Sequence, residues 1–106
     1  MNRITTVSEY QELLSQPGKH VIKIFASWCG PCKVLANVIN GLEDSIKNTF
    51  VEVDADEADD LIQQLNVRNV PVLIFYDGAK EYNRLVGAVA KDKIIQTFEN
   101  NILIGE

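Results

Sequence analysis

The residues with the greatest chemical capacity in this sequence are two cysteines, Cys29 and Cys32, separated by Gly30 and Pro31 and preceded by Trp28. The segment lies between a run of apolar residues and a stretch with helical periodicity, where a strand ends and a helix begins. A helix N-terminus stabilises a thiolate over a thiol, and only the thiolate attacks a disulfide. The two-residue spacing lets the second sulfur reach the first. The motif therefore predicts thiol–disulfide exchange, with Cys29 as nucleophile and Cys32 as resolving thiol.

The same pair allows two other interpretations, half of a metal site or two inert buried cysteines. A structural zinc site needs four soft ligands, and the sequence offers at most three, since His20 is the only histidine. An inert pair is disfavoured because a strand-to-helix turn exposes at least one sulfur. We expect Cys29 at the exposed lip of the turn and Cys32 one helical turn further in. No metal site is expected.

The elements that must position the cysteines alternate between strand and helix. Strands are expected at 21–26, 50–54, 72–76 and 82–86, the last returning antiparallel after a turn. Helices are expected after a capping box at Ser8–Gln11, along an apolar stripe from Val34 to Ile46, near 56–65, and from Lys91 to Ile102. The order β-α-β-α-β-α-β-β-α predicts a three-layer α/β fold, with the 21–26 strand at the centre of the sheet.

Composition limits the class of protein. With 106 residues the chain is expected to form a single domain, 1–106. Its 10 basic and 15 acidic residues give a net charge of −5, without a basic run, which argues against nucleic acid or an anionic membrane as a partner. No apolar stretch reaches the roughly 20 residues of a membrane span, and the first residues lack the pattern of a signal peptide. A cytoplasmic protein is expected.

Three motifs together resemble the thioredoxin family. Trp-Cys-Gly-Pro-Cys-Lys at 28–33 is similar to its active site, Val70-Pro71 before an apolar strand resembles its cis-proline turn, and Val86-Gly87-Ala88 resembles its substrate-facing glycine loop. The resemblance extends from about Arg3 to Ile102. It implies the thioredoxin fold, a central mixed β-sheet flanked by helices on both faces. It also implies dithiol–disulfide exchange with protein disulfide substrates.

The resemblance further implies a substrate surface and a set of partners. A cis Val70–Pro71 bond would press the backbone of Val70 against the cysteines, where an extended substrate segment could pair with the main chain. The expected substrate-binding residues are Trp28, Gly30, Pro31, Val70, Pro71, Gly87 and Ala88. A thioredoxin reductase is expected to recharge a monomeric protein that binds no cofactor and carries a redox-active Cys29–Cys32 disulfide.

The sequence departs from the family pattern at three positions. Lys23 replaces a buried aspartate six residues before the first cysteine, Phe50 replaces the lysine that pairs with it, and Asn37 replaces a proline that kinks the long helix. Lys23 either extends its ammonium group to solvent or stays near the cysteines, where it could act as a base or favour the thiolate and raise the reduction potential. We expect it to pair with Glu52 on the neighbouring strand, because an unpaired buried charge is costly.

The altered pair leaves a second function open. Some proteins of this fold are non-catalytic binding or chaperone-like partner subunits that use the apolar surface around the cysteines. A thiol oxidase is less favoured, because Gly30-Pro31 between the cysteines resembles the reducing members. Reduction of insulin disulfides with dithiothreitol separates the enzyme from the binding protein.

Overall fold

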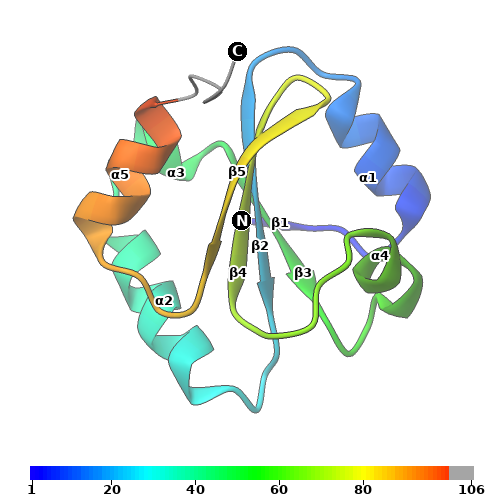
Figure 1. Cartoon of the computed structure of the whole chain (residues 1–106), viewed down its shortest axis with the longest axis horizontal. Coiled ribbons are helices and arrows are strands. Elements are labelled where there is room, and N and C mark those ends of the chain that lie inside the picture. The colour runs from blue at the N-terminus through cyan, green and yellow to red at the C-terminus, as the bar shows by residue number, and fades with distance from the viewer. Residues whose placement is uncertain (101–106) are drawn as a thin grey trace.

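The fold is a single mixed sheet with helices on both of its faces (Figure 1), in a computed structural model that describes residues 1–100. Five strands form the sheet: β1 (Asn2–Arg3), β2 (Lys19–Phe25), β3 (Phe50–Asp54), β4 (Val72–Asp77) and β5 (Lys80–Val86). The helices of the described part are α1 (Val7–Leu14), α2 (Gly30–Asn40), α3 (Asp44–Lys47), α4 (Asp59–Gln64) and α5 (Lys91–Glu99). The α/β class expected from the sequence is confirmed.

Strand β2 is the central strand, as its apolar composition predicted. The strand order is β1-β3-β2-β4-β5, so β2 has a neighbour on each side. It runs parallel to β3 and antiparallel to β4, and β4 and β5 form the expected antiparallel hairpin. Because β2 is held on both edges, its carboxyl end delivers the cysteine segment to a fixed place beside the sheet.

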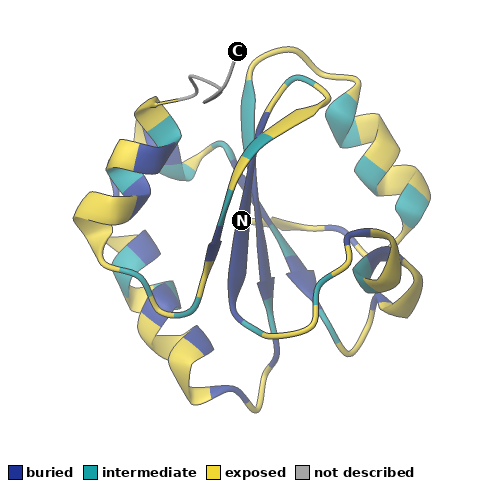
Figure 2. Ribbon diagram, in the orientation of Figure 1, coloured by how far each residue is buried: buried dark blue, intermediate teal, exposed yellow. Residues whose placement is uncertain are grey.

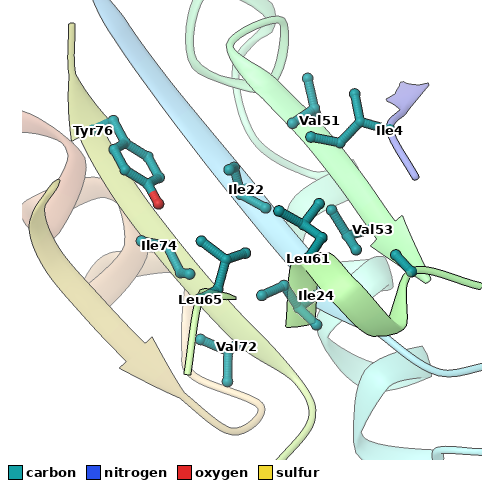
Figure 3. Close-up of a cluster of buried hydrophobic side chains, with 11 residues drawn as sticks. Ile4, Ile22, Ile24, Val51, Val53, Leu61, Leu65, Val72, Ile74 and Tyr76 are labelled. Carbon is teal, nitrogen blue, oxygen red and sulfur yellow. The ribbon is translucent and has the colours of Figure 1, made fainter. Parts of the chain in front are cut away.

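Alternate residues of the strands supply two hydrophobic cores, one on each face. In Figure 1, α2, α3 and α5 lie on one side of the sheet, and α1 and α4 lie on the other. Figure 3 shows the core under α1 and α4, where Ile22 and Ile24 of β2 meet Leu61 of α4. Val21 points to the opposite core and packs with Leu35 of α2. Figure 2 shows the outcome, with buried residues along the strands and exposed residues on the outer helix faces.

The capping box of α1 lies two residues earlier than the sequence predicted. Thr6 is the N-cap: its hydroxyl accepts a hydrogen bond from the Glu9 N–H at 3.1 Å, and the Glu9 carboxylate accepts one from the Thr6 N–H at 3.2 Å. The expected box at Ser8–Gln11 is wrong, because Ser8 already lies inside the helix. Both threonine and serine fit the capping-box pattern, Thr6 with Glu9 and Ser8 with Gln11. The Thr6 box has the advantage that Glu9 is charged, and a helix N-terminus favours a carboxylate.

The long helical stripe is also interrupted. Helix α2 ends at Asn40, Gly41 is its C-cap, and α3 begins at Asp44. Ile46 therefore belongs to α3, although it packs in the same core as Ile39 of α2. The helical spacing of apolar residues that predicted one long helix continues through the break, because α2 and α3 pack against the same face of the sheet. Helix α5 ends at Glu99, and Ile102 lies outside the described residues.

Removing each hydroxyl tests the position of the cap. Thr6→Ala should lower the free energy of unfolding by about 1 kcal/mol, because the Glu9 N–H loses its acceptor. Ser8→Ala removes the same group from an exposed helical position and should leave stability unchanged or slightly raised. Urea denaturation of both variants measures the difference. A larger loss for Ser8→Ala than for Thr6→Ala would contradict the assignment.

Candidate functional site

The two cysteines form a disulfide at the junction between β2 and α2. Cys29 is the N-cap of α2, and its backbone N–H donates to the carbonyl of Ala26 at 3.2 Å. Cys32 lies in the first helical turn, 5.3 Å from Cys29 between Cα atoms, and its N–H donates to the Cys29 sulfur at 3.2 Å. Pro31 occupies the first turn, where the absence of an N–H costs no helical hydrogen bond. One sulfur therefore lies where a helix N-terminus stabilises negative charge.

Both cysteines are buried, whereas Cys29 was expected to be exposed. The exposed fractions of Cys29 and Cys32 are 4% and 5%. The expectation treated Cys29 as a free thiol on an open turn. In the structure its sulfur is bonded to Cys32, and the carbonyl oxygen of Val70 lies 3.8 Å from it. The disulfide and the Val70 loop together cover the position that the sequence placed at the surface.

The loop that covers Cys29 contains the predicted cis-proline. The Val70–Pro71 peptide bond is cis, and Val70 is half-buried beside the cysteine pair. The Pro71 carbonyl accepts a hydrogen bond from the Gly87 N–H at 2.9 Å. Gly87 has φ of 92°, a left-handed conformation that favours glycine. Two segments distant in the sequence are thereby tied together next to Cys29.

Trp28 is the most exposed large hydrophobic side chain among the described residues. Its exposed fraction is 71%, yet its orientation is fixed because the indole N–H donates to the Asp56 carboxylate at 2.9 Å. The Asp56 N–H in turn donates to the Asp54 carboxylate at 2.9 Å, at the end of β3. A groove between Trp28 and Val70 continues toward Ile62. The ring therefore presents an apolar surface beside the disulfide instead of filling the core.

Sequence reasoning missed Asp56. The acidic stretch from Asp54 to Asp60 was interpreted as a solvated helix start, and nothing in its spacing distinguished one carboxylate from another. Asp54 is the last residue of β3, and an aspartate at a strand end often accepts a hydrogen bond from the N–H two residues later, in an Asx turn. That pattern would have predicted the position of the Asp56 backbone. Its partner on the tryptophan could not be inferred from local sequence.

The remaining residues of the predicted surface are in different settings. Gly30, Pro31 and Ala88 are exposed, and Gly87 is half-buried. Pro71 is buried, so its ring supports the loop and is not itself on the surface. Val86 was not assigned to the surface but is 60% exposed immediately before Gly87.

Lys23 lies under the cysteines and not in solvent. Its exposed fraction is 9%, and its ammonium nitrogen is 3.8 Å from the Glu52 carboxylate, on the register partner in β3. The same nitrogen lies 5.1 Å from the centre of the Phe25 ring. The expected Lys23–Glu52 ion pair is therefore present, and the extended, solvated conformation is not adopted.

Arg3 completes this charged group and was not singled out by the sequence. Its guanidinium donates to Glu52 at 2.6 and 3.0 Å and to Glu57 at 3.2 Å, and it also stands 5.1 Å from the Phe25 ring. The hydrogen bonds to Glu52 raise the pKa of Arg3 above its ordinary value. The pairing arises because β1 aligns Arg3 with Glu52 in the sheet, a register that the sequence did not predict.

The other two departures from the family pattern have simple structural outcomes. Phe50, where the family has a lysine, is 3% exposed and belongs to the core under α2. Asn37, where the family has a proline, is exposed on α2, and the helix continues through it to Asn40. Phe50 thus belongs to a different buried cluster from the two cysteines.

Two findings of absence concern residues 1–100, the part of the chain that the structure describes. No group of three or more histidine, cysteine, aspartate or glutamate side chains in this part of the chain is arranged to hold a metal ion. The helices of the described part also include none long and apolar enough to span a membrane.

Known proteins with the same features share one family. The Thioredoxin family model matches residues 2–100. A thioredoxin of Mycoplasmoides gallisepticum is 34% identical over 95 residues, which cover 89% of this chain and 95% of that protein. Thioredoxin-2 of Saccharomyces cerevisiae is 39% identical over 90 residues, covering 83% and 86% of the two chains.

Solved structures agree with the sequence relatives. The oxidised form of mitochondrial thioredoxin 3 from Saccharomyces cerevisiae superposes with a TM-score of 0.85 at 25% identity and covers 93% of each chain. The residues matched by the family model, 2–100, include the disulfide, the cis-proline loop and all five strands described above. The chain belongs to the thioredoxin family, and it is a thiol–disulfide oxidoreductase that reduces protein disulfides through Cys29 and Cys32.

Proposed function

We propose that Cys29 is the attacking sulfur and Cys32 the resolving one. In the reduced protein the Cys29 thiolate attacks one sulfur of a substrate disulfide, a Cys29–substrate disulfide forms, and the other substrate sulfur leaves as a thiolate. The Cys32 thiolate then attacks the Cys29 sulfur, so the Cys29–Cys32 bond forms and the second substrate thiolate is released. Two electrons pass to the substrate, and its thiolates take protons from solvent.

The position of Cys29 as the N-cap of α2 is the observation that carries this assignment. Its sulfur accepts the Cys32 N–H at 3.2 Å, so a backbone dipole is already directed at the negative charge of a thiolate. Cys29 also adjoins the Val70 carbonyl and the exposed Trp28. Cys32 lies one turn inside the helix and faces the charged group at Lys23 and Glu52 instead.

The substrate surface is the rim around Cys29. Substrate side chains would contact exposed Trp28 and Pro31, and the substrate backbone would pair with the Val70 main chain, whose carbonyl already points at the disulfide. Gly30, Gly87 and Ala88 add little side-chain bulk to this rim, and buried Pro71 holds the Val70 loop in place. An extended protein segment with an exposed disulfide can make these contacts, whereas a small disulfide compound is too short to reach all of them.

The wider setting follows from the family. A thioredoxin reductase would return electrons to the Cys29–Cys32 disulfide, which makes the protein a carrier in electron transport. The chain would work as a monomeric single domain, 1–106, since one sheet carries both helical layers. The cytoplasm is the proposed location, because a reducing compartment keeps such a pair available for repeated cycles.

Serine substitutions separate the roles of the two sulfurs. Cys29→Ser should abolish reduction of insulin disulfides with dithiothreitol as electron donor, because the attacking thiolate is lost. Cys32→Ser should form the first bond but not break it, so mixed disulfides accumulate at Cys29 and are detected by mass spectrometry. Accumulation in Cys29→Ser instead, with normal turnover by Cys32→Ser, would reverse the two roles.

The Asp56 carboxylate provides a test of the substrate surface. Asp56→Ala should raise KM for a protein disulfide roughly two- to tenfold, because Trp28 loses the partner that orders it and ordering one side chain on binding costs about 0.5–1.5 kcal/mol. The turnover number should change little, since no sulfur is displaced. Asp60→Ala, which removes a nearby charge that does not contact Trp28, is the matched control. Equal KM values for both variants would exclude Trp28 orientation as a determinant of binding.

A further inference from the structure

Lys23 directs its charge toward the cysteine end of β2. Side chains two residues apart on a strand share a face, and the Lys23 ammonium lies 5.1 Å from the ring of Phe25. Phe25 in turn packs against the cluster formed by Ala26, Cys29 and Cys32. The ammonium is therefore separated from the disulfide cluster by a single aromatic side chain.

A cavity connects the two groups directly. It has a volume of about 230 Å³, and its walls include both Lys23 and Cys32. Cys29 is not among the residues that line it. The cavity thus places Lys23 on the side of the disulfide where Cys32 lies.

The charged groups around this cavity leave Lys23 incompletely neutralised. Arg3 and Lys33 also line the cavity, and Glu52 is the only carboxylate that does so in the described structure. Glu52 gives its shorter contacts to Arg3, at 2.6 and 3.0 Å, against 3.8 Å to Lys23. The neighbouring cavity is lined by Lys23 and Lys47, and among the described residues that line it Glu52 is again the only carboxylate. The ammonium is anchored by Glu52 while most of that carboxylate's interaction goes to Arg3.

We propose that Lys23 is a positioning residue for the second step of the exchange, in which its fixed positive charge favours the Cys32 thiolate. The proposal rests on the proposed function, in which Cys32 resolves the mixed disulfide. The proton of Cys32 leaves to water through the cavity, and the thiolate then attacks the Cys29 sulfur. That sulfur forms the new bond to Cys32, the bond to the substrate breaks, and the substrate sulfur leaves with the electron pair.

The charge of Lys23, and not its capacity to accept a proton, carries this role. Glu52 lies 3.8 Å from the ammonium, and opposite charges at this distance attract each other. A buried cation without a partner would be costly, so Glu52 also holds the charge in place. Arginine, which stays protonated, should therefore replace Lys23, whereas an uncharged side chain should not.

The experiment follows the titration of Cys32 alone. In the Cys29→Ser protein, the ultraviolet absorbance of the thiolate is measured against pH. Adding Lys23→Met should reduce the thiolate fraction near neutral pH by about tenfold, the effect of losing one nearby opposite charge. Lys23→Arg should keep it within about twofold. Loss of the thiolate in Lys23→Met together with its retention in Lys23→Arg is a pattern that general destabilisation does not produce.

Lys47→Met is the matched control, because it removes the same charge from the neighbouring cavity that Cys32 does not line. It should leave the Cys32 titration unchanged. Three results would overturn the proposal: an unchanged titration in Lys23→Met, a loss in Lys23→Arg equal to that in Lys23→Met, or an equal effect of Lys47→Met. If Lys23→Met does not fold, Lys23→Gln removes the same charge with a polar side chain and is compared with Lys23→Arg in its place. Failure of the unmodified protein to reduce insulin would instead contradict the proposed function and leave the titration unaffected.

Discussion

The hydrogen bonds that hold β2 between β3 and β4 determine the position of every group in the active site. They fix the end of the strand after Phe25, and the chain has only a short turn in which to reach the N-cap of α2 at Cys29. The antiparallel neighbour β4 brings the cis Val70–Pro71 loop to the same end of the sheet. The parallel neighbour β3 brings Asp56 to the indole of Trp28. The reactive sulfurs therefore depend on strand pairing more than on any contact of their own.

The same pairing places charge beneath the disulfide. Alternation along β2 and β3 directs Lys23 and Glu52 to the face covered by α2, and the short β1 adds Arg3. In the proposed mechanism the N-terminus of α2 stabilises the Cys29 thiolate, and the buried ammonium of Lys23 stabilises the Cys32 thiolate. Each sulfur then has a separate source of positive potential. The two steps of the exchange can thus be adjusted by different residues. Reversing the polarity of the usual buried pair still leaves a resolving sulfur beside a charged side chain.

Sequence patterns predicted what is encoded locally or repeated along the chain. The Cys29–Cys32 motif and the strand-helix order could be predicted, because spacing and periodicity are visible in one dimension. The cis Val70–Pro71 bond was expected only from the resemblance to the family. The helix break at Gly41 could not be, since two helices on one sheet face keep a common apolar period. The prediction that Cys29 is exposed was wrong, because the loop at Val70 that covers it is distant in the sequence. The contacts of Arg3 and Asp56 depend on strand register and on a long-range partner, neither of which composition reveals.

The Cys29–Cys32 disulfide at this junction belongs to a thiol–disulfide oxidoreductase, and its reversible two-electron reduction can be measured directly. The most direct test equilibrates the protein with mixtures of reduced and oxidised dithiothreitol and counts free thiols by alkylation and mass spectrometry. We predict one transition in which both thiols appear together, at a potential lower than that of the glutathione pair. Thiols that appear separately, or a transition at a potential above that of glutathione, would contradict this account.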